Sequence, residues 1–410
     1  MTQINKLKIF NDPIYGFITI PNALIYDLIQ HPYFQRLRRI SQMGLSYLVY
    51  PGANHTRFHH ALGCMHIMQK AVDVLRFKGV SINPEEENAL YIAILLHDIG
   101  HGPFSHAMES SIVEDVHHEA ISLLFMEQLN TEFKGQLTLA IQVFKGEYHR
   151  KFMLQLISSQ LDMDRMDYLK RDSFYSGVSE GNVNSERIIQ MMNVVEDVLV
   201  IEEKGIYSVE KFLMSRRLMY WQVYLHKTSL VAELILTKIL KRAKELTQKG
   251  IDLPCSEGLL FFMKNKITLD TFDFKTLDFF SQLDDFDIIS ALKAWQKEDD
   301  YILSALSKMI INRDLLKIKL SSDKVPTEAL LPLKEQFIAL HPSISVTDAG
   351  YFIFKGKIKS QAYSKIAEPI RILKKDKTIE DVVDVSDQLN LKSLSRLVTK
   401  YYICFPKQLL

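Results

Sequence analysis

The sequence predicts a mostly α-helical fold with short β-hairpins and a small α+β region at its C-terminal end. Apolar residues recur with helical spacing through almost all of 22–196 and again through 208–249. Strand-like alternation is confined to short stretches and becomes frequent only beyond Pro332. We therefore divide the 410 residues into a helical unit with an N-terminal hairpin, 1–330, and a small α+β region, 331–410.

The first elements are expected close to the N-terminus. A turn at Asn11–Pro13 followed by alternation through Phe17–Ile20 predicts a hairpin over 9–21. Helices are then expected from 22 to about 196. Acidic and aromatic sequence over 270–287 predicts further short helices joined by loops.

A second hairpin is predicted after residue 197. Val198–Glu202 and Ile206-Tyr207 would be its strands, and Lys204-Gly205 would be its turn. The segment 208–249 is periodic throughout and ends at Gly250, a residue that favours helix ends. Because this segment is longer than an ordinary globular helix, we expect a kink or break in it.

The C-terminal region is predicted to contain one more hairpin, one helix and one strand. The hairpin would run through 344–346, Gly350 and Tyr351–Phe354. The helix would span Ile379–Leu389, and the final strand would lie near Tyr401–Phe405.

Composition narrows the classes of function. Lys plus Arg number 50 and Asp plus Glu number 49, so no global charge favours nucleic acid or an anionic membrane. The cysteines are Cys64, Cys255 and Cys404, and none forms a C-x-x-C pair, which argues against disulfides and a cysteine–zinc site. Residues 1–12 form no apolar leader, and no stretch approaches the ~18 apolar residues of a membrane span. We expect a soluble cytoplasmic protein.

The most informative motif is the run from His97 to His106, His-Asp-Ile-Gly-His-Gly-Pro-Phe-Ser-His. It directly follows the apolar stretch Ala89–Leu96, so it is expected at the end of a buried helix. Imidazole and carboxylate groups are costly to bury unpaired and are good ligands for transition metals. The run therefore indicates a metal-assisted hydrolase.

Two further segments could meet this run at one metal ion. One holds His59-His60 after Arg57, and the other holds Asp164 within 161–168. Two histidines and two carboxylates suit Mn, Fe, Ni or Zn with positions open for water and a phosphate oxygen. A fourth segment, His117–Glu119, is interpreted as a source of general acid–base groups. Each residue alone also fits a structural role, and it is their order along the chain that favours the metal site.

One predicted helix carries a polar stripe. Asp164, Tyr168 and Asp172 are spaced at i, i+4 and i+8, so they share one helix face, and Arg165 flanks them. This face could hold a metal, pack a sugar and bond a hydroxyl group. A solvated polar face is the alternative.

These motifs resemble those of the HD-domain phosphohydrolases, and specifically the deoxynucleoside triphosphate (dNTP) triphosphohydrolases. That family includes bacterial dGTPase-type enzymes and the vertebrate SAM- and HD-domain dNTPase. The resemblance extends from residue 11 to about 230 and implies an HD-domain helical fold. The matching runs are N-D-P-I-Y-G at 11–16, F-Q-R-L-R at 34–38, T-R-F-H-H-A-L-G at 56–63, the run 97–106, His118-Glu119, D-R-M-D-Y at 164–168 and Y-L-H-K at 224–227.

The resemblance implies a role for each matching residue, and its spacing selects the second histidine of each doublet. The implied metal ligands are His60, His97, Asp98 and Asp164. The implied catalytic residues are His118, oriented by Glu119, and His101 beside the scissile phosphate. The implied substrate contacts are Arg57, His106, Arg165 and Arg216 on the triphosphate, Gln42, Tyr168 and Asp172 around the deoxyribose, and Tyr224 near the base and sugar.

The activity that the resemblance implies is hydrolysis of dNTPs to deoxynucleoside and tripolyphosphate, with dGTP as the expected preferred substrate. Water attacks the α-phosphorus, and the 5′ oxygen leaves with a proton from a histidine. A divalent transition metal is expected at the HD site and Mg²⁺ on the triphosphate. Tyr168 is expected to crowd the 2′ position. Leu225 departs from relatives with a polar residue there, so base selectivity stays open.

Two alternatives remain from the sequence alone. One is an HD phosphohydrolase for another nucleotide: a nucleotidase, a cyclic-dinucleotide phosphodiesterase or a (p)ppGpp hydrolase. The other is a non-catalytic nucleotide sensor. The three cations Arg57, Arg165 and Arg216 favour a triphosphate, and the intact His118-Glu119 pair favours an enzyme.

Family members are often nucleotide-activated homo-oligomers, and Lys8, Arg36 and Arg38 are candidate contacts for an activator. A second basic set lies near the C-terminus. A solvated edge strand protected by lysines is the favoured interpretation, and the alternative is a contact with a subunit, a regulatory nucleotide or single-stranded nucleic acid. This set comprises Lys355, Lys357, Lys359, Lys365, Arg371, Lys374, Lys375 and Lys377.

Overall fold

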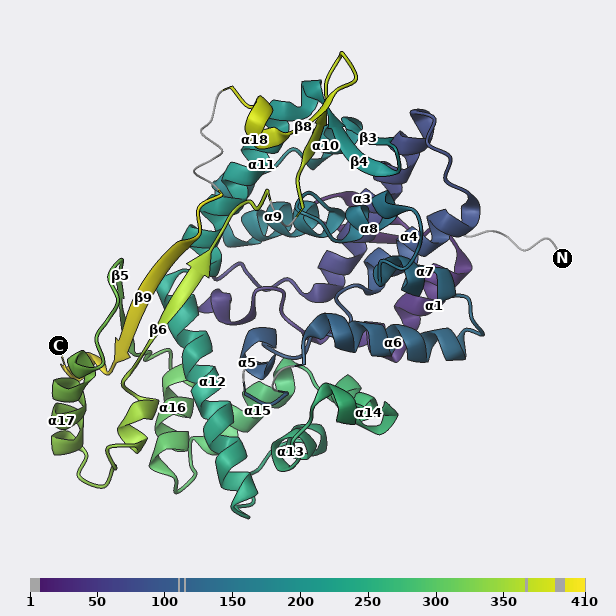
Figure 1. Ribbon diagram of the computed structural model, residues 1–410. Helices are drawn as coiled ribbons and strands as arrows, with labels where there is room; N and C mark the ends of the chain where they lie inside the picture. The colour runs from purple at the N-terminus through teal and green to yellow at the C-terminus, as the bar shows by residue number, and fades with distance from the viewer. Residues whose placement is uncertain (1–7, 110, 114–115, 366–367, 388–394, 410) are drawn as a thin grey trace.

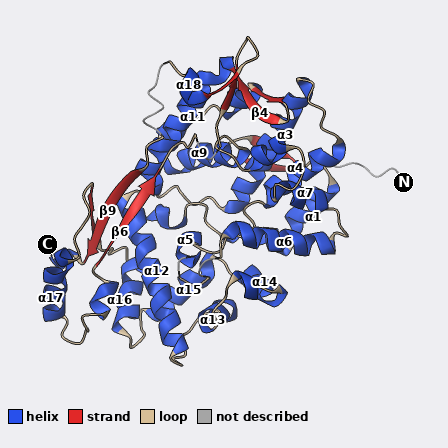
Figure 2. Cartoon of the chain, viewed as in Figure 1, coloured by secondary structure: helices blue, strands red, loops and turns tan. Residues whose placement is uncertain are grey.

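The computed structural model describes residues 8–109, 111–113, 116–365, 368–387 and 395–409, without the side chains of Ser105 and His106. The fold is mostly helical with three small sheets, which confirms the predicted fold class (Figures 1 and 2). No helix in the described ranges is long and apolar enough to cross a membrane.

The helices of eight or more residues form the body of the molecule. They are α1 (Ala23–Gln30), α3 (Arg57–Phe77), α4 (Pro84–Leu96), α6 (His118–Glu132), α9 (Met163–Ser176), α11 (Ile206–Met219), α12 (Lys227–Gln248), α13 (Glu257–Lys264), α14 (Phe274–Gln282), α15 (Asp285–Trp295), α16 (Tyr301–Ile311) and α17 (Leu331–Leu340). The shorter α-helices are α2 (Pro32–Gln35), α5 (Ser105–Glu109), α7 (Thr138–Phe144), α8 (Lys151–Ile157), α10 (Ser185–Gln190) and α18 (Val382–Val385).

The N-terminal hairpin forms as predicted. Strands β1 (Ile9–Asp12) and β2 (Gly16–Thr19) pair antiparallel. The Asp12 side chain accepts hydrogen bonds from the amides of Ile14 and Tyr15, which closes the turn between the strands.

Helices α3, α4 and α9 pack together at the centre of the N-terminal part. Helix α4 begins with a capping box between Asn83 and Glu86 and has Pro84 in its first turn, a strong start signal. Its last eight residues, Ala89–Leu96, are all buried. This helix therefore delivers the polar run that follows it into the interior of the protein.

The long periodic segment after residue 205 is broken, as expected. It consists of α11, a π-helical turn over Tyr220–Tyr224, and α12. His226 lies at the break, where its Nδ1 accepts from the amide of Thr228 and caps α12. The π-turn ends at Tyr224, and such turns recur at functional sites.

The second predicted hairpin is confirmed in its strand Val198–Glu202, but its turn at Lys204-Gly205 and its second strand at Ile206-Tyr207 are wrong. Its strands are β3 (Met192–Val195) and β4 (Val198–Glu202), and Ile206-Tyr207 begins α11. The turn lies at Glu196 and Asp197, which both have positive φ. Val198–Glu202 pairs with the preceding segment because this turn reverses the chain there.

The small helices predicted over 270–287 are present in α14 and the start of α15.

Of the elements predicted for the C-terminal region, the strand is confirmed, whereas the hairpin and the helix are wrong. The strand near Tyr401–Phe405 is confirmed as part of β9 (Val398–Phe405). The hairpin over 344–354 is wrong, because Asp348–Tyr351 is a 3₁₀ turn and β6 (Phe354–Ser360) pairs with β9.

The helix predicted over 379–389 is also wrong. Strand β8 (Ile379–Asp381) pairs with β7 (Arg371–Leu373), and only Val382–Val385 is helical. The end of the predicted helix, from residue 388, lies outside the described residues.

Both C-terminal sheets include strands from before residue 331. One has the order β3-β4-β7-β8, with β4 and β7 parallel, and the other has the order β5-β9-β6, with β5 at Lys317–Ser321. The division at residue 330 stays a prediction. Lys355, Lys357 and Lys359 lie on β6, which is an edge strand, so the lysine-protected edge is present.

Candidate metal centre and substrate pocket

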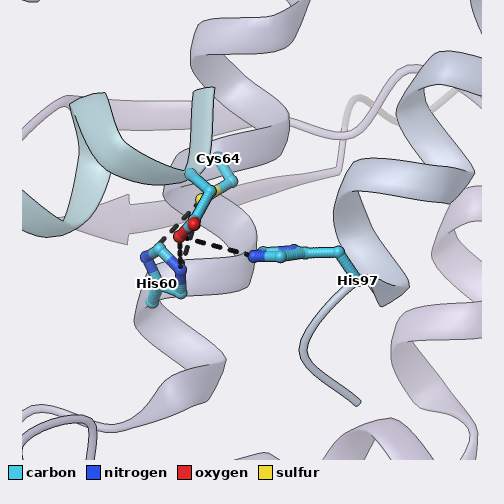
Figure 3. A group of neighbouring side chains, drawn as sticks. His60, Cys64 and His97 are labelled. Atoms are coloured by element: carbon cyan, nitrogen blue, oxygen red, sulfur yellow. Dashed lines mark hydrogen bonds and ion pairs between the residues drawn. The ribbon is translucent and has the colours of Figure 1, made fainter. Parts of the chain in front are cut away.

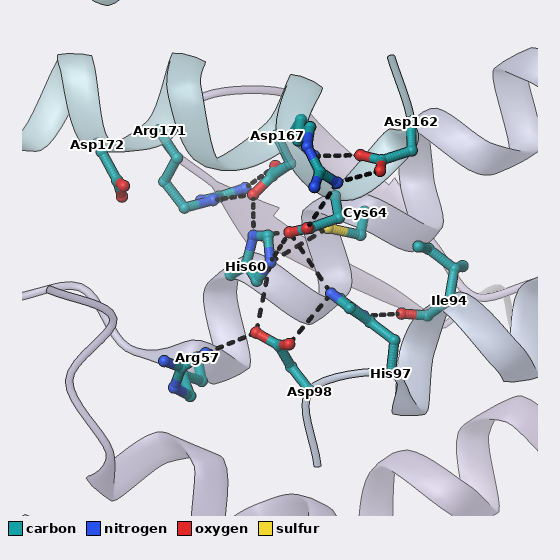
Figure 4. A network of polar contacts seen from close by, with 12 residues as sticks. Arg57, His60, Cys64, Ile94, His97, Asp98, Asp162, Asp167, Arg171 and Asp172 are labelled. Atoms are coloured by element: carbon teal, nitrogen blue, oxygen red, sulfur yellow. Dashed lines mark hydrogen bonds and ion pairs between the residues drawn. The ribbon is translucent and has the colours of Figure 1, made fainter. Parts of the chain in front are cut away.

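Three central helices bring the four predicted ligands together. His60 lies in the first turn of α3, His97 and Asp98 follow the last residue of α4, and Asp164 lies in the first turn of α9. Asp162 caps α9 by accepting from the amide of Arg165, so the position of Asp164 follows from a strong helix start. His60, His97 and Asp98 point toward one another (Figure 4), and the ligand atoms of His60, His97 and Asp164 lie within 4.8 Å of one another.

Short distances join the four side chains. His60 Nε2 lies 3.1 Å from Asp164 Oδ1 and 3.7 Å from Asp98 Oδ2. His97 Nε2 lies 3.4 Å from Asp98 Oδ1 and 3.5 Å from Asp164 Oδ1. The two imidazoles thus meet two carboxylates within one small volume.

The other ring nitrogen of each histidine is occupied. His60 Nδ1 contacts Asp167 Oδ2 at 2.7 Å, and His97 Nδ1 contacts the carbonyl oxygen of Ile94 at 2.7 Å (Figure 4). A proton on each Nδ1 leaves the Nε2 lone pair available for a cation, the usual arrangement around metal-binding histidines. A ligand set of two imidazoles and two carboxylates therefore fits a divalent metal, and it does not select among Mn, Fe, Ni and Zn.

Asp167 is held by a buried arginine. Arg171 donates from Nε and Nη2 to Asp167 at 2.9 and 3.0 Å and from Nη1 to Asp12 at 2.7 Å. Burial opposes ionisation, but Arg171 and His60 outweigh it and lower the pKa of Asp167 to about 2. Gly63 permits this approach, because a Cβ atom there would lie 2.0 Å from Asp167 Oδ1.

Arg171→Met is expected to lower the free energy of unfolding by about 3–5 kcal/mol, because Asp12 and Asp167 would remain buried without their cation. Urea denaturation measures this loss. Arg187→Met is the control, since Arg187 is exposed and its loss should cost no more than about 0.5 kcal/mol. A loss equal to that of the control would contradict a supporting role for Arg171.

Cys64 is a member of the cluster that the sequence did not indicate. Its Sγ lies 3.5 Å from Nδ1 and 3.6 Å from Nε2 of His60 (Figure 3). Nearly equal distances to both nitrogens place the sulfur against the ring rather than along the lone pair of Nε2. The thiol therefore packs against His60 from the next turn of α3.

We expect Cys64→Ala to keep its full metal content and its fold, with a stability loss of order 1 kcal/mol for a small buried side chain. Metal analysis of the purified variant beside the unmodified protein tests this. A fall in the metal stoichiometry of this variant would contradict the prediction and show that the Cys64 thiolate is a ligand.

His101 and His118 form a second pair beside Asp98. Their rings stack with centroids 3.8 Å apart, and His101 Nε2 lies 3.3 Å from Asp98 Oδ1. Burial and the Arg57 charge lower the pKa of His101 well below its usual range, so a neutral ring stacks on His118. Gly100 lets α6 approach, because a Cβ atom there would lie 2.3 Å from the carbonyl oxygen of His118.

The carboxylate beside His118 corrects the sequence interpretation. His118 Nδ1 contacts Glu109 Oε1 at 3.1 Å, whereas Glu119 is exposed on α6. The reason is helix direction: consecutive residues at the start of α6 point about 100° apart, and α5 brings Glu109 to the inner side. The sequence signal for Glu109 is its place three residues after His106, in a short helix that runs back toward the site.

The three predicted cations lie around the centre in different environments. Arg57 Nη1 donates to Asp98 Oδ2 at 2.6 Å. Arg165 pairs with Asp162, and Arg216 lies with its guanidinium 5.9 Å from the Tyr220 ring centroid. Nε of Arg165 and both Nε and Nη1 of Arg216 are buried and have no hydrogen-bond partner among the described residues. Those N–H groups are suited to an anion.

A cavity of about 310 Å³ opens beside the centre. The four predicted contacts to the sugar and base line it: Gln42, Tyr168, Asp172 and Tyr224. Arg57 lines it too, which connects the cavity to the metal cluster. Tyr168 and Asp172 follow Asp164 along one face of α9, so the predicted stripe faces the cavity.

His55 contacts two residues of the cavity wall, and the sequence did not indicate it. Its Nε2 contacts Asp172 Oδ1 at 2.7 Å, and Tyr224 donates to Asp172 Oδ2 at 2.8 Å. The carbonyl of His55 also accepts from the amide of Gln42. From the loop before α3, His55 thus contacts the lining residues Asp172 and Gln42, and no local sequence pattern indicates these contacts.

The remaining predictions have separate outcomes. The side chain of His106 lies outside the described part of the chain. Arg36 is wrong as an activator contact, because it is fully buried and donates to the carbonyls of Ile99 and Leu283. Arg38 stacks on Phe58 at 3.6 Å, and Lys8 lies 4.7 Å from the Tyr26 ring, so their role toward an activator stays a prediction.

Comparison with known proteins agrees with this geometry. The HD domain model matches residues 57–172, and the HD-associated region model matches residues 183–253. The uncharacterized protein YwfO of Bacillus subtilis is 41% identical over 77% of this chain and 72% of its own length. A phosphohydrolase crystal structure from Bacteroides thetaiotaomicron is 50% identical, covers 98% of this chain and 100% of its own, and has a TM-score of 0.94.

A more distant relative carries a specific activity in its name. The deoxynucleoside triphosphate triphosphohydrolase SAMHD1 homolog of Dictyostelium discoideum is 30% identical over 58% of this chain and 50% of its own length. With its central helices, its His-Asp cluster and these matches, the chain belongs to the HD-domain phosphohydrolases that carry an HD-associated region.

Proposed function

We propose that the protein hydrolyses dNTPs to deoxynucleoside and tripolyphosphate, with dGTP as the preferred substrate. One observation carries this proposal: Tyr168 and Asp172, which follow Asp164 along one face of α9, line a cavity that Arg57, bonded to Asp98, also lines. Eight residues of helix span about 12 Å, which suits a nucleotide lying along α9 with its phosphates at Asp164. The name of the Dictyostelium relative supports the same substrate class.

A divalent metal ion held by His60, His97, Asp98 and Asp164 would supply a polarised water and neutralise charge on the phosphoryl oxygens. The metal is proposed to be Mn, Fe, Ni or Zn, with Mg²⁺ on the triphosphate. Arg57, Arg165 and Arg216 offset the remaining charge on the triphosphate. His106 is proposed as a further phosphate contact.

His118 is proposed to hold the proton that the leaving 5′ oxygen takes. Water attacks the α-phosphorus, the bond between that phosphorus and the 5′ oxygen breaks, and the proton moves to the deoxynucleoside. Glu109 contacts Nδ1 of His118, so Nε2 is free to face the substrate. His101 stacks on the same ring and holds its plane.

The sugar is proposed to lie among Gln42, Tyr168, Asp172 and Tyr224. Asp172 has both oxygens engaged, by His55 and by Tyr224, which fixes it as a hydrogen-bond acceptor for the 3′ hydroxyl. The Tyr168 ring lies between the His60 ring and the Tyr224 ring, at 6.4 and 6.1 Å. It therefore restricts space for a 2′ hydroxyl. An activating nucleotide and assembly into a homo-oligomer are part of the proposal.

Product analysis tests this function. The purified protein is incubated with Mn²⁺ or Mg²⁺ and each dNTP, singly and in pairs, and the products are separated by anion exchange. Tripolyphosphate with deoxynucleoside is the expected result, and dependence on a second dNTP would reveal activation. Orthophosphate or pyrophosphate would overturn it and direct attention to another nucleotide. Absence of turnover with bound nucleotide would indicate a sensor.

A further inference from the structure

Glu233 on α12 places a carboxyl group in the wall of the same cavity. The lining of this cavity also includes the apolar side chains of Met43, Phe104, Leu225 and Leu230 and the polar side chains of Gln42 and Ser46. A Cβ atom at Gly44 would lie 3.6 Å from Glu233 Oε1, so the carboxyl group lies against this glycine, whose lack of a side chain leaves the cavity open there.

The carboxyl group of Glu233 is unusual among the charged groups of this cavity. Arg57 is paired with Asp98, and Asp172 is bonded by His55 and Tyr224. The Glu233 carboxyl group has no hydrogen bond or ion pair to any described residue, and burial alone raises its pKa to about 7. Glu233 is half-buried, so its carboxyl group faces the cavity without a protein partner, and a ligand that excludes water there must donate to it or leave it unpaired.

We propose that Glu233 reads the base of the substrate and selects guanine through hydrogen bonds from N1–H and the N2 amino group. This inference rests on the proposed function, because it assumes that a nucleotide occupies this cavity. A carboxylate offers two acceptor oxygens side by side. Guanine presents two adjacent N–H donors on its Watson–Crick edge, so both oxygens are satisfied at once.

The other bases match this group less well. Adenine and cytosine each present one amino donor beside a ring acceptor, which would face the second carboxylate oxygen. Thymine presents one imino donor between two carbonyl acceptors. Apolar Leu225 and Leu230 offer no alternative polar contact to these edges. Binding adenine, cytosine or thymine would therefore exclude water from the Glu233 carboxylate and leave part of it unpaired.

The first test uses the unmodified protein and needs no substitution. Equilibrium binding is measured at pH 8 with the α-thio analogues of dGTP and deoxyinosine triphosphate, which differ only in the N2 amino group. One lost hydrogen bond to a charged acceptor predicts about 10-fold weaker binding or more for the inosine analogue. Equal affinities would overturn the inference.

The second test is Glu233→Gln, which keeps the size of the side chain and replaces one acceptor by a donor. The amide matches the donor–acceptor edge of adenine. The affinity ratio of the α-thio analogues of dGTP and dATP should fall by about 10- to 100-fold. Glu328→Gln, an exposed change, is the control and should leave the ratio unchanged. An unchanged ratio in Glu233→Gln, or equal losses for both nucleotides, would refute base reading by Glu233.

The two proposals fail in different ways. If the base preference shifts but no dNTP is hydrolysed, the reading of guanine by Glu233 stands and the proposed hydrolysis fails. If dNTPs are hydrolysed with an unshifted preference, the hydrolysis stands and the role of Glu233 fails. A thermal melt of each variant separates loss of fold from loss of preference.

Discussion

Replacing Asp164 with alanine is expected to remove the bound metal and all dNTP turnover while the protein stays folded. Asp164 Oδ1 lies closest of the two carboxylates to His60 Nε2, at 3.1 Å, and it also approaches His97. It takes no part in the buried pair of Asp167 and Arg171 that supports α3 and α9. Metal analysis, product analysis and a thermal melt of the purified variant measure the three quantities.

A matched change on the surface serves as control for this variant. Asp73 is exposed on α3, the helix that carries His60, and Asp73→Ala should keep metal, turnover and melting temperature. Turnover with a full metal complement in Asp164→Ala would show that this carboxylate is not a ligand. In that case Asp98 and the two histidines would have to hold the metal with a different fourth group.

His118→Ala is expected to lower kcat by about 10² or more while the metal remains bound, as for the loss of a general acid. The side chain contacts Glu109 and stacks on His101, and neither contact involves His60, His97 or Asp164. Single-turnover kinetics with dGTP, together with metal analysis, separates the chemical step from metal loss. A wild-type rate in this variant would instead assign the role of general acid to His101 or His117.

A pair of carboxylate variants distinguishes the two candidate partners of His118. Glu109→Gln should lower kcat in the same direction as His118→Ala, because Glu109 contacts Nδ1 and sets the orientation of the ring. Glu119→Gln should leave kcat near the wild-type value, because this side chain is exposed. The reverse pattern would restore the assignment that the sequence suggested. The metal content of each variant is measured as well, so that a change in kcat is distinguished from a loss of metal.

Local sequence determined the helices and the ligand types of this protein. Capping residues, Pro84 and apolar periodicity define α4, and the next two residues are His97 and Asp98. The stripe on α9 follows from the same 3.6-residue period. The sequence did not predict the strands β6, β7 and β8. Their pairing partners lie far away along the chain: β4 pairs with β7 about 170 residues later, and β6 pairs with β9 across 38 or more residues.

Only the tertiary structure decided which side chains face one another. Glu109 rather than Glu119 contacts His118 because the fold brings the end of α5 to the first residue of α6, and Gly100 allows α6 to approach the segment after α4. Glu233 lines the cavity from α12, His55 contacts the lining residue Asp172 from a loop, and neither lies in a motif. Periodicity and caps are properties of neighbouring residues and can be read locally. Side-chain partners depend on the packing of segments distant in sequence, which these local patterns do not encode.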